Sequence, residues 1–242
     1  MIVGQRKPFD QILEMLRPHK RVLVLGCGGC VTICLSGGEK QADELAAQLR
    51  LAARNHGLDL TVDTDCITRQ CDREFLDTMK RDPKQYDAVL SLACGVGVGL
   101  MSELLPTVRF LPALDTTFYG ANTAPGVWAE YCHGCGECAL AWTAGICPIA
   151  RCSKSLINGA CGGTNKGKCE VSNEMDCAWY LIYKRLQELG RLDDLRKVRP
   201  ARQWSKDRGK GVRRLTHEEM TEEAGLPALL PAVAGPVAGT PK

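Results

Sequence analysis

Histidine and aromatic residues are scarce in this sequence. Among 242 residues only four are histidine, and Phe, Trp and Tyr together make up 5%. Histidine is the side chain that enzymes most often use for proton transfer, so little acid–base machinery can be built here. The chain also contains no H-E-x-x-H segment and no Ser-His-Asp pattern. The sequence therefore gives no indication of hydrolytic chemistry and suggests no catalytic residue.

Long apolar segments are missing as well. The longest apolar run, Val22 to Leu35, has 14 residues and is interrupted by Gly and Cys, whereas a helix needs roughly 20 apolar residues to span a bilayer. Charged residues interrupt Met1 to Pro18, so this segment lacks the apolar core of a signal peptide. We expect a cytoplasmic protein that does not contact a membrane.

The net charge is small overall, and the excess of positive charge is confined to one stretch. The formal net charge is +3, but Arg191 to Arg214 holds ten Lys or Arg against three Asp or Glu. This stretch is interpreted either as a solvated connector or as a docking arm for an acidic partner surface. Only Trp204 interrupts it, so the interleaved aromatic residues of a single-strand binder are missing. We expect no nucleic-acid partner.

Cysteine, in contrast, is abundant. Fourteen cysteines in a chain of this length indicate either a secreted disulfide scaffold or an intracellular metalloprotein. Since the N-terminus does not resemble a signal peptide, the second explanation is favoured, because thiols stay reduced in the cytoplasm and can bind metals.

The hydrophobic pattern predicts a small doubly wound α/β domain of the Rossmann or flavodoxin-like type. Strands are expected at 21–26, 58–62, 86–92 and 108–111, and helices at 9–17, 39–55, 72–80 and 98–105. Residues 116–127 are expected to be a linker, followed by an irregular Cys-rich region with a helix over 176–189. We therefore divide the chain into an α/β domain (1–115), a Cys-rich domain (116–190) and a basic connector with an Ala/Pro/Gly-rich tail (191–242).

Six cysteines follow predicted strands of the α/β domain. They are Cys27, Cys30 and Cys34 after the first strand, Cys66 and Cys71 after the second, and Cys94 after the third. In a doubly wound sheet these carboxyl ends open onto the crevice where ligands bind. We predict a four-thiolate site there for Zn²⁺ or a [4Fe–4S] cluster, with Cys30 and Cys94 as the firmest ligands. The alternative is a set of buried, apolar cysteines.

Eight further cysteines dominate the Cys-rich region: Cys132, Cys135, Cys138, Cys147, Cys152, Cys161, Cys169 and Cys177. The opening C-x2-C-x2-C resembles a bacterial ferredoxin run, but eight residues rather than three separate Cys138 from Cys147. Eight thiolates match two [4Fe–4S] clusters, although spacing does not show which cysteines share a cluster. Zinc ribbons use paired C-x2-C knuckles, and only half of such a pair is present, so iron–sulfur clusters are favoured over zinc.

One extended motif resembles a known family. The segment N-G-A-C-G-G-x3-G-K-C-E-V from Asn158, followed by D-C-A-W-x3-Y-x2-L from Asp176, is similar to the methylenetetrahydrofolate reductase C-terminal domain family. The preceding cysteines and the α/β domain extend the likeness to its free-standing, MetV-type small subunit over roughly residues 5–205. The resemblance implies that the eight cysteines from Cys132 to Cys177 are cluster ligands.

The resemblance also implies a partner. Members of this family associate with a MetF-type flavoprotein, expected to carry FMN, which reduces 5,10-methylenetetrahydrofolate to 5-methyltetrahydrofolate in one-carbon metabolism. This chain would then be the non-catalytic iron–sulfur subunit that relays electrons to the flavin, from further electron-donor subunits or from a ferredoxin-like or pyridine-nucleotide-linked donor. The alternative is a structural zinc or iron–sulfur protein that stabilises the partner without electron transfer.

Overall fold

A computed structural model describes residues 1–203. The tail from Glu222 to Lys242, and the part of the basic stretch beyond residue 203, lie outside the described residues. Within 1–203, none of the helices is long and apolar enough to cross a membrane. Within these residues the chain divides into two units, one made of Met1–His133 with Ala139–Arg199, the other including Gly134–Cys138 with residues 200–203.

A parallel sheet of four strands forms the centre of the α/β part, as the sequence predicts. Its strands are β2 (Arg21–Cys27), β3 (Thr61–Ile67), β4 (Ala88–Ser91) and β5 (Phe110–Pro112), in the spatial order β3-β2-β4-β5. All residues of β2 after the first are buried, which explains why this strand is a continuous apolar run rather than an alternating one.

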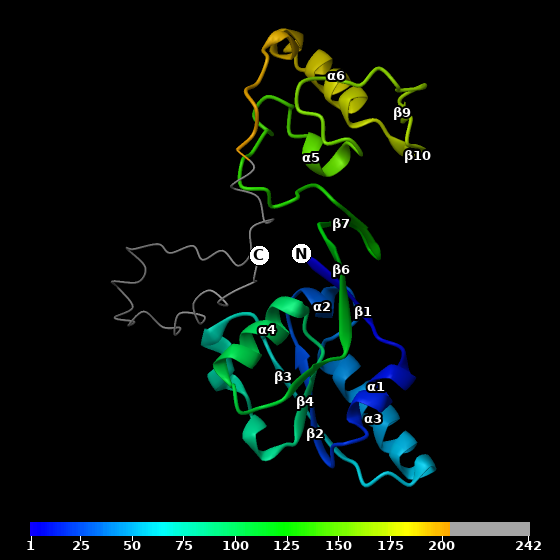
Figure 1. Cartoon of the computed structure of the whole chain (residues 1–242), viewed down its shortest axis with the longest axis vertical. Helices are drawn as coiled ribbons and strands as arrows, with labels where there is room; N and C mark the ends of the chain where they lie inside the picture. Colours follow the sequence, from blue (N-terminus) through cyan, green and yellow to red (C-terminus); the bar gives the residue numbers. More distant parts are fainter. Residues whose placement is uncertain (204–242) are drawn as a thin grey trace, which may run out of the picture. The chain divides into compact units, whose positions relative to one another are not determined.

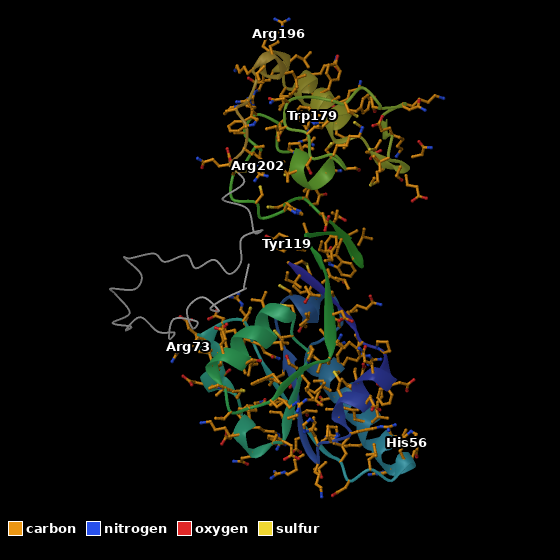
Figure 2. The ribbon with its side chains drawn as sticks, in the orientation of Figure 1. His56, Arg73, Tyr119, Trp179, Arg196 and Arg202 are labelled. Atoms are coloured by element: carbon orange, nitrogen blue, oxygen red, sulfur yellow. The ribbon has the colours of Figure 1, made fainter. Side chains whose placement is uncertain are left out.

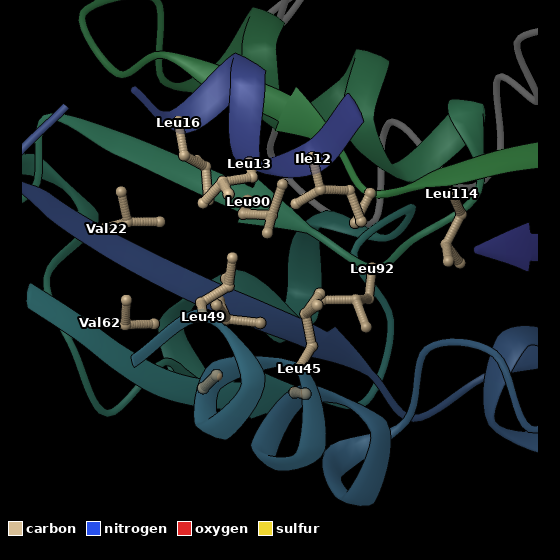
Figure 3. Packing of buried hydrophobic residues seen from close by; sticks show 14 of the residues in the cluster. Ile12, Leu13, Leu16, Val22, Leu45, Leu49, Val62, Leu90, Leu92 and Leu114 are labelled. Atoms are coloured by element: carbon tan, nitrogen blue, oxygen red, sulfur yellow. The ribbon is translucent and has the colours of Figure 1, made fainter. Parts of the chain in front are cut away.

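Helices cover both faces of this sheet (Figure 1). Helices α1 (Phe9–Leu16) and α3 (Glu39–His56) bury their apolar sides against one face. Figure 3 shows Ile12 and Leu45 in the same cluster as Val22 of β2. On the other face, α4 (Gly95–Leu104) and the 3₁₀ helix η1 (Arg73–Thr78) pack against Leu23 and Leu25. Successive residues of β2 point to opposite faces, so Val22 and Val24 pack on the side of α1 and α3, and Leu23 and Leu25 on the other side. Burying each leucine contributes about 1.5–3 kcal/mol.

Several boundaries differ from the prediction. β3 begins three residues later and extends to Ile67, so Cys66 lies inside the strand rather than after it. The predicted helix over 72–80 is the 3₁₀ helix η1. Residues 83–85 form a second 3₁₀ helix, η2 (Pro83–Gln85).

The predicted linker over 116–127 is wrong. It contains β6 (Leu114–Tyr119) and β7 (Ala121–Ala124), the latter paired with β8 (Val127–Ala129). Strand β6 pairs antiparallel with β1 (Ile2–Arg6), which the sequence pattern did not reveal. The partners are more than 100 residues apart in the chain, and such distant pairing leaves no local signal in a Thr- and Gly-rich segment.

The Cys-rich part has short elements and a small core of its own. It contains α5 (Pro148–Arg151), β9 (Lys168–Cys169), β10 (Ser172–Asp176), α6 (Ala178–Glu188) and the 3₁₀ helix η3 (Leu192–Arg196). Ile146, Trp179, Ile182 and Leu186 form the core. The indole N–H of Trp179, labelled in Figure 2, donates to the carbonyl of Leu156 at 3.0 Å. The predicted helix over 176–189 is thus present, and its apolar face holds the surrounding loops.

The first residues of the basic stretch pack on this part of the chain. The guanidinium of Arg199 lies 4.1 Å from the ring centroid of Trp142. The Asn158 side chain donates to the Arg199 carbonyl at 3.0 Å and accepts from its amide N–H at 2.7 Å. These contacts order the backbone up to residue 199 against the Cys-rich loops.

Candidate metal centres

The first candidate centre lies at the carboxyl end of the parallel sheet. After β2 the chain passes to β3 on one side, and afterwards to β4 on the other, so the loops diverge between β2 and β4. Such a switch point is where open α/β sheets bind ligands. Cys27 is the last residue of β2, and Cys94, three residues after the end of β4, is the N-cap of α4. Cys30 begins the short helix α2 (Cys30–Ile33) between them in sequence.

Three thiols of this region influence Cys71. Desolvation raises the pKa of the Cys71 thiol, and the nearby sulfur of Cys27 raises it further. Cys94 and Cys30 act on the Cys71 pKa in the same direction. Because charge interactions weaken with distance, these three thiols lie in the same region as Cys71. Cys30 and Cys94 are the two residues that the sequence favours as ligands.

Gln70 fixes the position of the loop that carries Cys71. It is fully buried, and its side-chain amide donates to the carbonyls of Leu25 and Gly26 at 2.9 and 3.0 Å. The hydroxyl of Ser91 donates to its side-chain oxygen at 2.7 Å. Gln70 thereby connects the loop after β3 to the ends of β2 and β4. No sequence signal points to Gln70, because a glutamine beside a cysteine matches no motif.

Hydrogen bonds also hold the loop after β2 in place. The amide N–H of Gly28 donates to the Ile67 carbonyl at 2.8 Å, and the Thr32 hydroxyl donates to the Cys27 carbonyl at 2.7 Å. A Cβ on Gly37 would lie 2.0 Å from the carbonyl oxygen of Leu92, so only glycine fits there. This close backbone approach positions Cys27 and Cys30 at the edge of the sheet.

The other two cysteines of this set have different surroundings. The Cys34 sulfur lies 3.0 Å from the Ser36 hydroxyl and 3.9 Å from the Gly4 carbonyl oxygen. Cys66 lines a polar cavity of about 410 Å³ together with Glu39 and Asp43. Burial, and next the Glu39 carboxylate, raise the pKa of Cys66 to about 11. The Cys66 thiol is consequently neutral at physiological pH. Cys27 also raises the pKa of Cys66, so these two thiols lie close enough to interact.

The second candidate centre is the Cys-rich part, whose cysteines flank its short elements. Cys147 and Cys152 bracket α5, and Cys177 is the N-cap of α6. Cys152 and Cys177 both pack against the small core. The amide N–H of Cys177 donates to the Gly167 carbonyl at 2.8 Å, which connects α6 to the loop before β9. The core around Trp179 thus fixes the backbone at these two thiols.

Cys161 and Cys169 lie in a polar neighbourhood. The Cys169 sulfur is 3.7 Å from the Ser153 hydroxyl, and the Cys161 sulfur is 3.7 Å from a carboxylate oxygen of Glu170. The amide N–H of Val171, and then the Ser153 hydroxyl, lower the pKa of Cys169. Metals bind the thiolate form, so these donors favour the state that a ligand needs.

The C-x2-C-x2-C segment includes both buried and exposed thiols. Cys135 is buried, whereas Cys132 and Cys138 are exposed. The guanidinium of Arg202 donates to the Cys135 carbonyl at 3.1 Å, and the amide N–H of Gln203 donates to the Glu137 carboxylate at 3.0 Å. The backbone of this segment is therefore held by Arg202 and Gln203.

All fourteen cysteines are free thiols. Their chemistry matches what zinc and iron–sulfur clusters require, and the four thiols of the switch point match in number as well. In residues 1–203, however, no three His, Cys, Asp or Glu side chains are arranged closely enough to hold a metal ion. The assignment of the fourteen cysteines as ligands, and their division between clusters, stays a prediction.

Comparison with known families covers the Cys-rich part. Residues 111–205 match a family described as "Methylene-tetrahydrofolate reductase C terminal". This segment is similar to that family. The match confirms the resemblance drawn from the Asn158 and Asp176 motifs and associates the chain with methylenetetrahydrofolate reductase. No curated protein and no solved structure matched the chain.

The methylenetetrahydrofolate reductase C-terminal segment contains all eight cysteines of the second set. The thiols of the switch point precede residue 111 and lie outside the match. The two candidate centres thus depend on separate observations. The second is supported by the family match and the cysteine spacing, and the first by the sheet topology and by the effect of three nearby thiols on the pKa of Cys71.

Proposed function

We propose that this chain is the iron–sulfur small subunit of a methylenetetrahydrofolate reductase complex. In this role it relays electrons to the flavin of a MetF-type catalytic subunit that reduces 5,10-methylenetetrahydrofolate. The observation that carries the proposal is the combination of a methylenetetrahydrofolate reductase family segment with eight free cysteines and a second group of four thiols at a sheet switch point.

The described residues suit metal binding better than acid–base chemistry. Cysteine is the commonest ligand of iron–sulfur clusters, which supply one-electron transfer when bound. In this proposal Cys27, Cys30, Cys71 and Cys94 hold one centre, which is either a [4Fe–4S] cluster or Zn²⁺. The eight cysteines from Cys132 to Cys177 hold two [4Fe–4S] clusters. The chain offers little besides thiols for catalysis, since it has only four histidines, so folate and FMN are assigned to the partner.

In this proposal the protein around the clusters tunes their reduction potential and positions their thiol ligands. Backbone N–H groups near the sulfurs tune a cluster's potential, and buried loops exclude water. The N–H of Val171 at Cys169 is such a donor. Gln70 holds the Cys71 loop at the sheet edge through two backbone carbonyls. Both contacts position thiols without contacting a substrate.

The experiment that tests the proposal is anaerobic purification of the full chain, with and without a co-expressed MetF-type flavoprotein. Iron, zinc and acid-labile sulfide are then quantified, and EPR spectra are recorded after reduction. We expect iron and sulfide for two or three [4Fe–4S] clusters, a reducible EPR signal and a stable complex with the flavoprotein. Rapid mixing of the reduced complex should show electron transfer to the flavin.

Two outcomes would overturn the proposal. Zinc alone, without sulfide or a reducible signal, would show a structural metal protein that stabilises its partner. Clusters that are reduced but never exchange electrons with the flavin would also exclude the relay.

A further inference from the structure

The Cys-rich part contains a cavity of about 490 Å³ whose lining is rich in cations. Arg151 contributes from α5, and Lys184 and Arg185 contribute from the exposed side of α6. A volume of this size accommodates a small molecule rather than a single ion. The cavity differs from both candidate metal centres, because no cysteine is among its described lining residues.

Two carboxylates, Asp176 and Glu188, line the cavity beside the three cations, which leaves an excess of one positive charge. Lys168, which lies outside the lining, pairs with Asp176 at 2.7 Å, and Lys168 and then Arg151 lower the pKa of Asp176. Within residues 1–203, none of Arg151, Lys184 and Arg185 makes an ion pair. Three like charges around one cavity repel each other, and a bound anion removes that repulsion.

An aromatic ring completes one wall. The Arg151 guanidinium lies 5.6 Å from the ring centroid of Tyr131, which is 45% exposed. Arginine that stacks on an aromatic ring keeps its outer N–H groups available for a carboxylate or a phosphate. Leu181 and Ile146 add apolar surface beside the ring. Polar groups converging on a partly apolar wall are typical of small-molecule sites.

We infer that this cavity binds a small organic anion that carries two or more carboxylate or phosphate groups. Arg151, Lys184 and Arg185 supply the charge-assisted hydrogen bonds, and Tyr131 contacts the ligand's body. This site is additional to the proposed electron relay and does not depend on it.

The location suggests what binding would affect. Four lining residues immediately precede a cysteine of the second set: Tyr131, Ile146, Arg151 and Asp176. A ligand that contacts these residues adjoins the backbone that positions Cys132, Cys147, Cys152 and Cys177. Binding is therefore expected to alter the surroundings of those thiols.

Calorimetric titration of the anaerobically purified full chain tests the inference. Pyrophosphate and citrate serve as probes and separate the phosphate source from the carboxylate source. The test variant is the double substitution Lys184→Gln and Arg185→Gln, which retains good helix formers at exposed positions. The control is the double substitution Arg17→Gln and Arg196→Gln, which removes the same charge from exposed, ion-paired sites. Arg151→Gln is a second, independent test variant.

We expect saturable binding of at least one probe to the natural chain and to the control. Affinity should fall about tenfold or more in the test variants, because each loses at least one charge-assisted hydrogen bond. The probe that binds more tightly shows whether the acidic groups of the ligand are phosphates or carboxylates. The inference is overturned if neither probe saturates, or if the test variants bind as tightly as the control. Thermal unfolding without a probe confirms that each variant is folded.

Discussion

The hydroxyl of Ser91 donates a 2.7 Å hydrogen bond to the side-chain oxygen of Gln70, and both residues are fully buried. Ser91 ends β4 and Gln70 directly precedes Cys71. The bond therefore joins two of the loops that carry candidate metal ligands. A buried hydrogen-bonded pair of this kind fixes a single arrangement, because any alternative leaves polar atoms unsatisfied.

Replacing Gln70 by alanine should destabilise the α/β part and loosen its metal site. The substitution Gln70→Ala removes the acceptor of the Ser91 hydroxyl and a donor to the carbonyls of Leu25 and Gly26, which costs about 1–3 kcal/mol. Urea unfolding measures this loss. Gln48→Ala, at an exposed position, is the control and should change stability by less than about 0.5 kcal/mol. Equal effects of the two substitutions would contradict the positioning role.

Serine substitutions should separate the six cysteines of the α/β part into two classes. Cys27→Ser, Cys71→Ser and Cys94→Ser should each lower the metal content by the equivalent of one centre, because each removes one of the four thiols proposed as its ligands. Cys34→Ser is the matched control, since this sulfur contacts Ser36 and the Gly4 carbonyl instead. Elemental analysis of anaerobically purified variants measures the difference. If only Cys34→Ser lost metal, the site would have to include Cys34 rather than the other three cysteines.

Trp179 should be essential to the small core of the Cys-rich part. Trp179→Phe keeps most of the apolar surface but leaves the carbonyl of Leu156 without the indole N–H. We expect a loss of about 1–3 kcal/mol in unfolding free energy. The control is Tyr180→Phe on the same helix, where the side chain is 38% exposed. Unfolding followed by near-ultraviolet circular dichroism compares the two variants. If Trp179→Phe were as stable as the natural chain, the hydrogen bond from Trp179 to Leu156 would not contribute to stability.

Asp87 should make stability depend on pH in the acidic range. Its carboxylate accepts the amide N–H groups of Arg21 and Lys20 at 2.9 and 2.8 Å, and these bonds lower the pKa of Asp87. A lowered folded-state pKa stabilises the fold above the ordinary aspartate pKa of 3.8 and ceases to do so as pH falls through the lowered value. The natural chain should therefore unfold at a higher temperature than Asp87→Ala at pH 7.

The same comparison at lower pH completes this test. The difference in melting temperature between the natural chain and Asp87→Ala should shrink as the pH falls below 3.8. Asp82→Ala is a suitable control, because Asp82 is also exposed and accepts one amide N–H, from Lys84. A difference for Asp87 that stays constant down to the lowest accessible pH would contradict the assigned direction of its pKa.

Local patterns were sufficient for the strongly periodic elements. The apolar run of β2, the helical spacing of Leu45 and Leu49 in α3 and the apolar face of α6 each reflect burial along a single segment. The four-stranded parallel sheet follows from their alternation. The pairing of β1 with β6 could not be predicted, because its energy comes from residues more than 100 positions apart.

The sequence by itself predicted thiolate chemistry and determined the family resemblance of this protein. Fourteen cysteines, few histidines and the motifs from Asn158 and Asp176 indicate thiolate ligands and the methylenetetrahydrofolate reductase family, because these properties depend on residue type and spacing. Only the tertiary structure decided which thiols are neighbours. Cys27, Cys30 and Cys94 act on the pKa of Cys71, and Cys27 also acts on that of Cys66, whereas the Cys34 sulfur contacts the Ser36 hydroxyl and the Gly4 carbonyl. The physical reason is that strand register and the buried bonds of Gln70 set distances between loops that are remote in the chain.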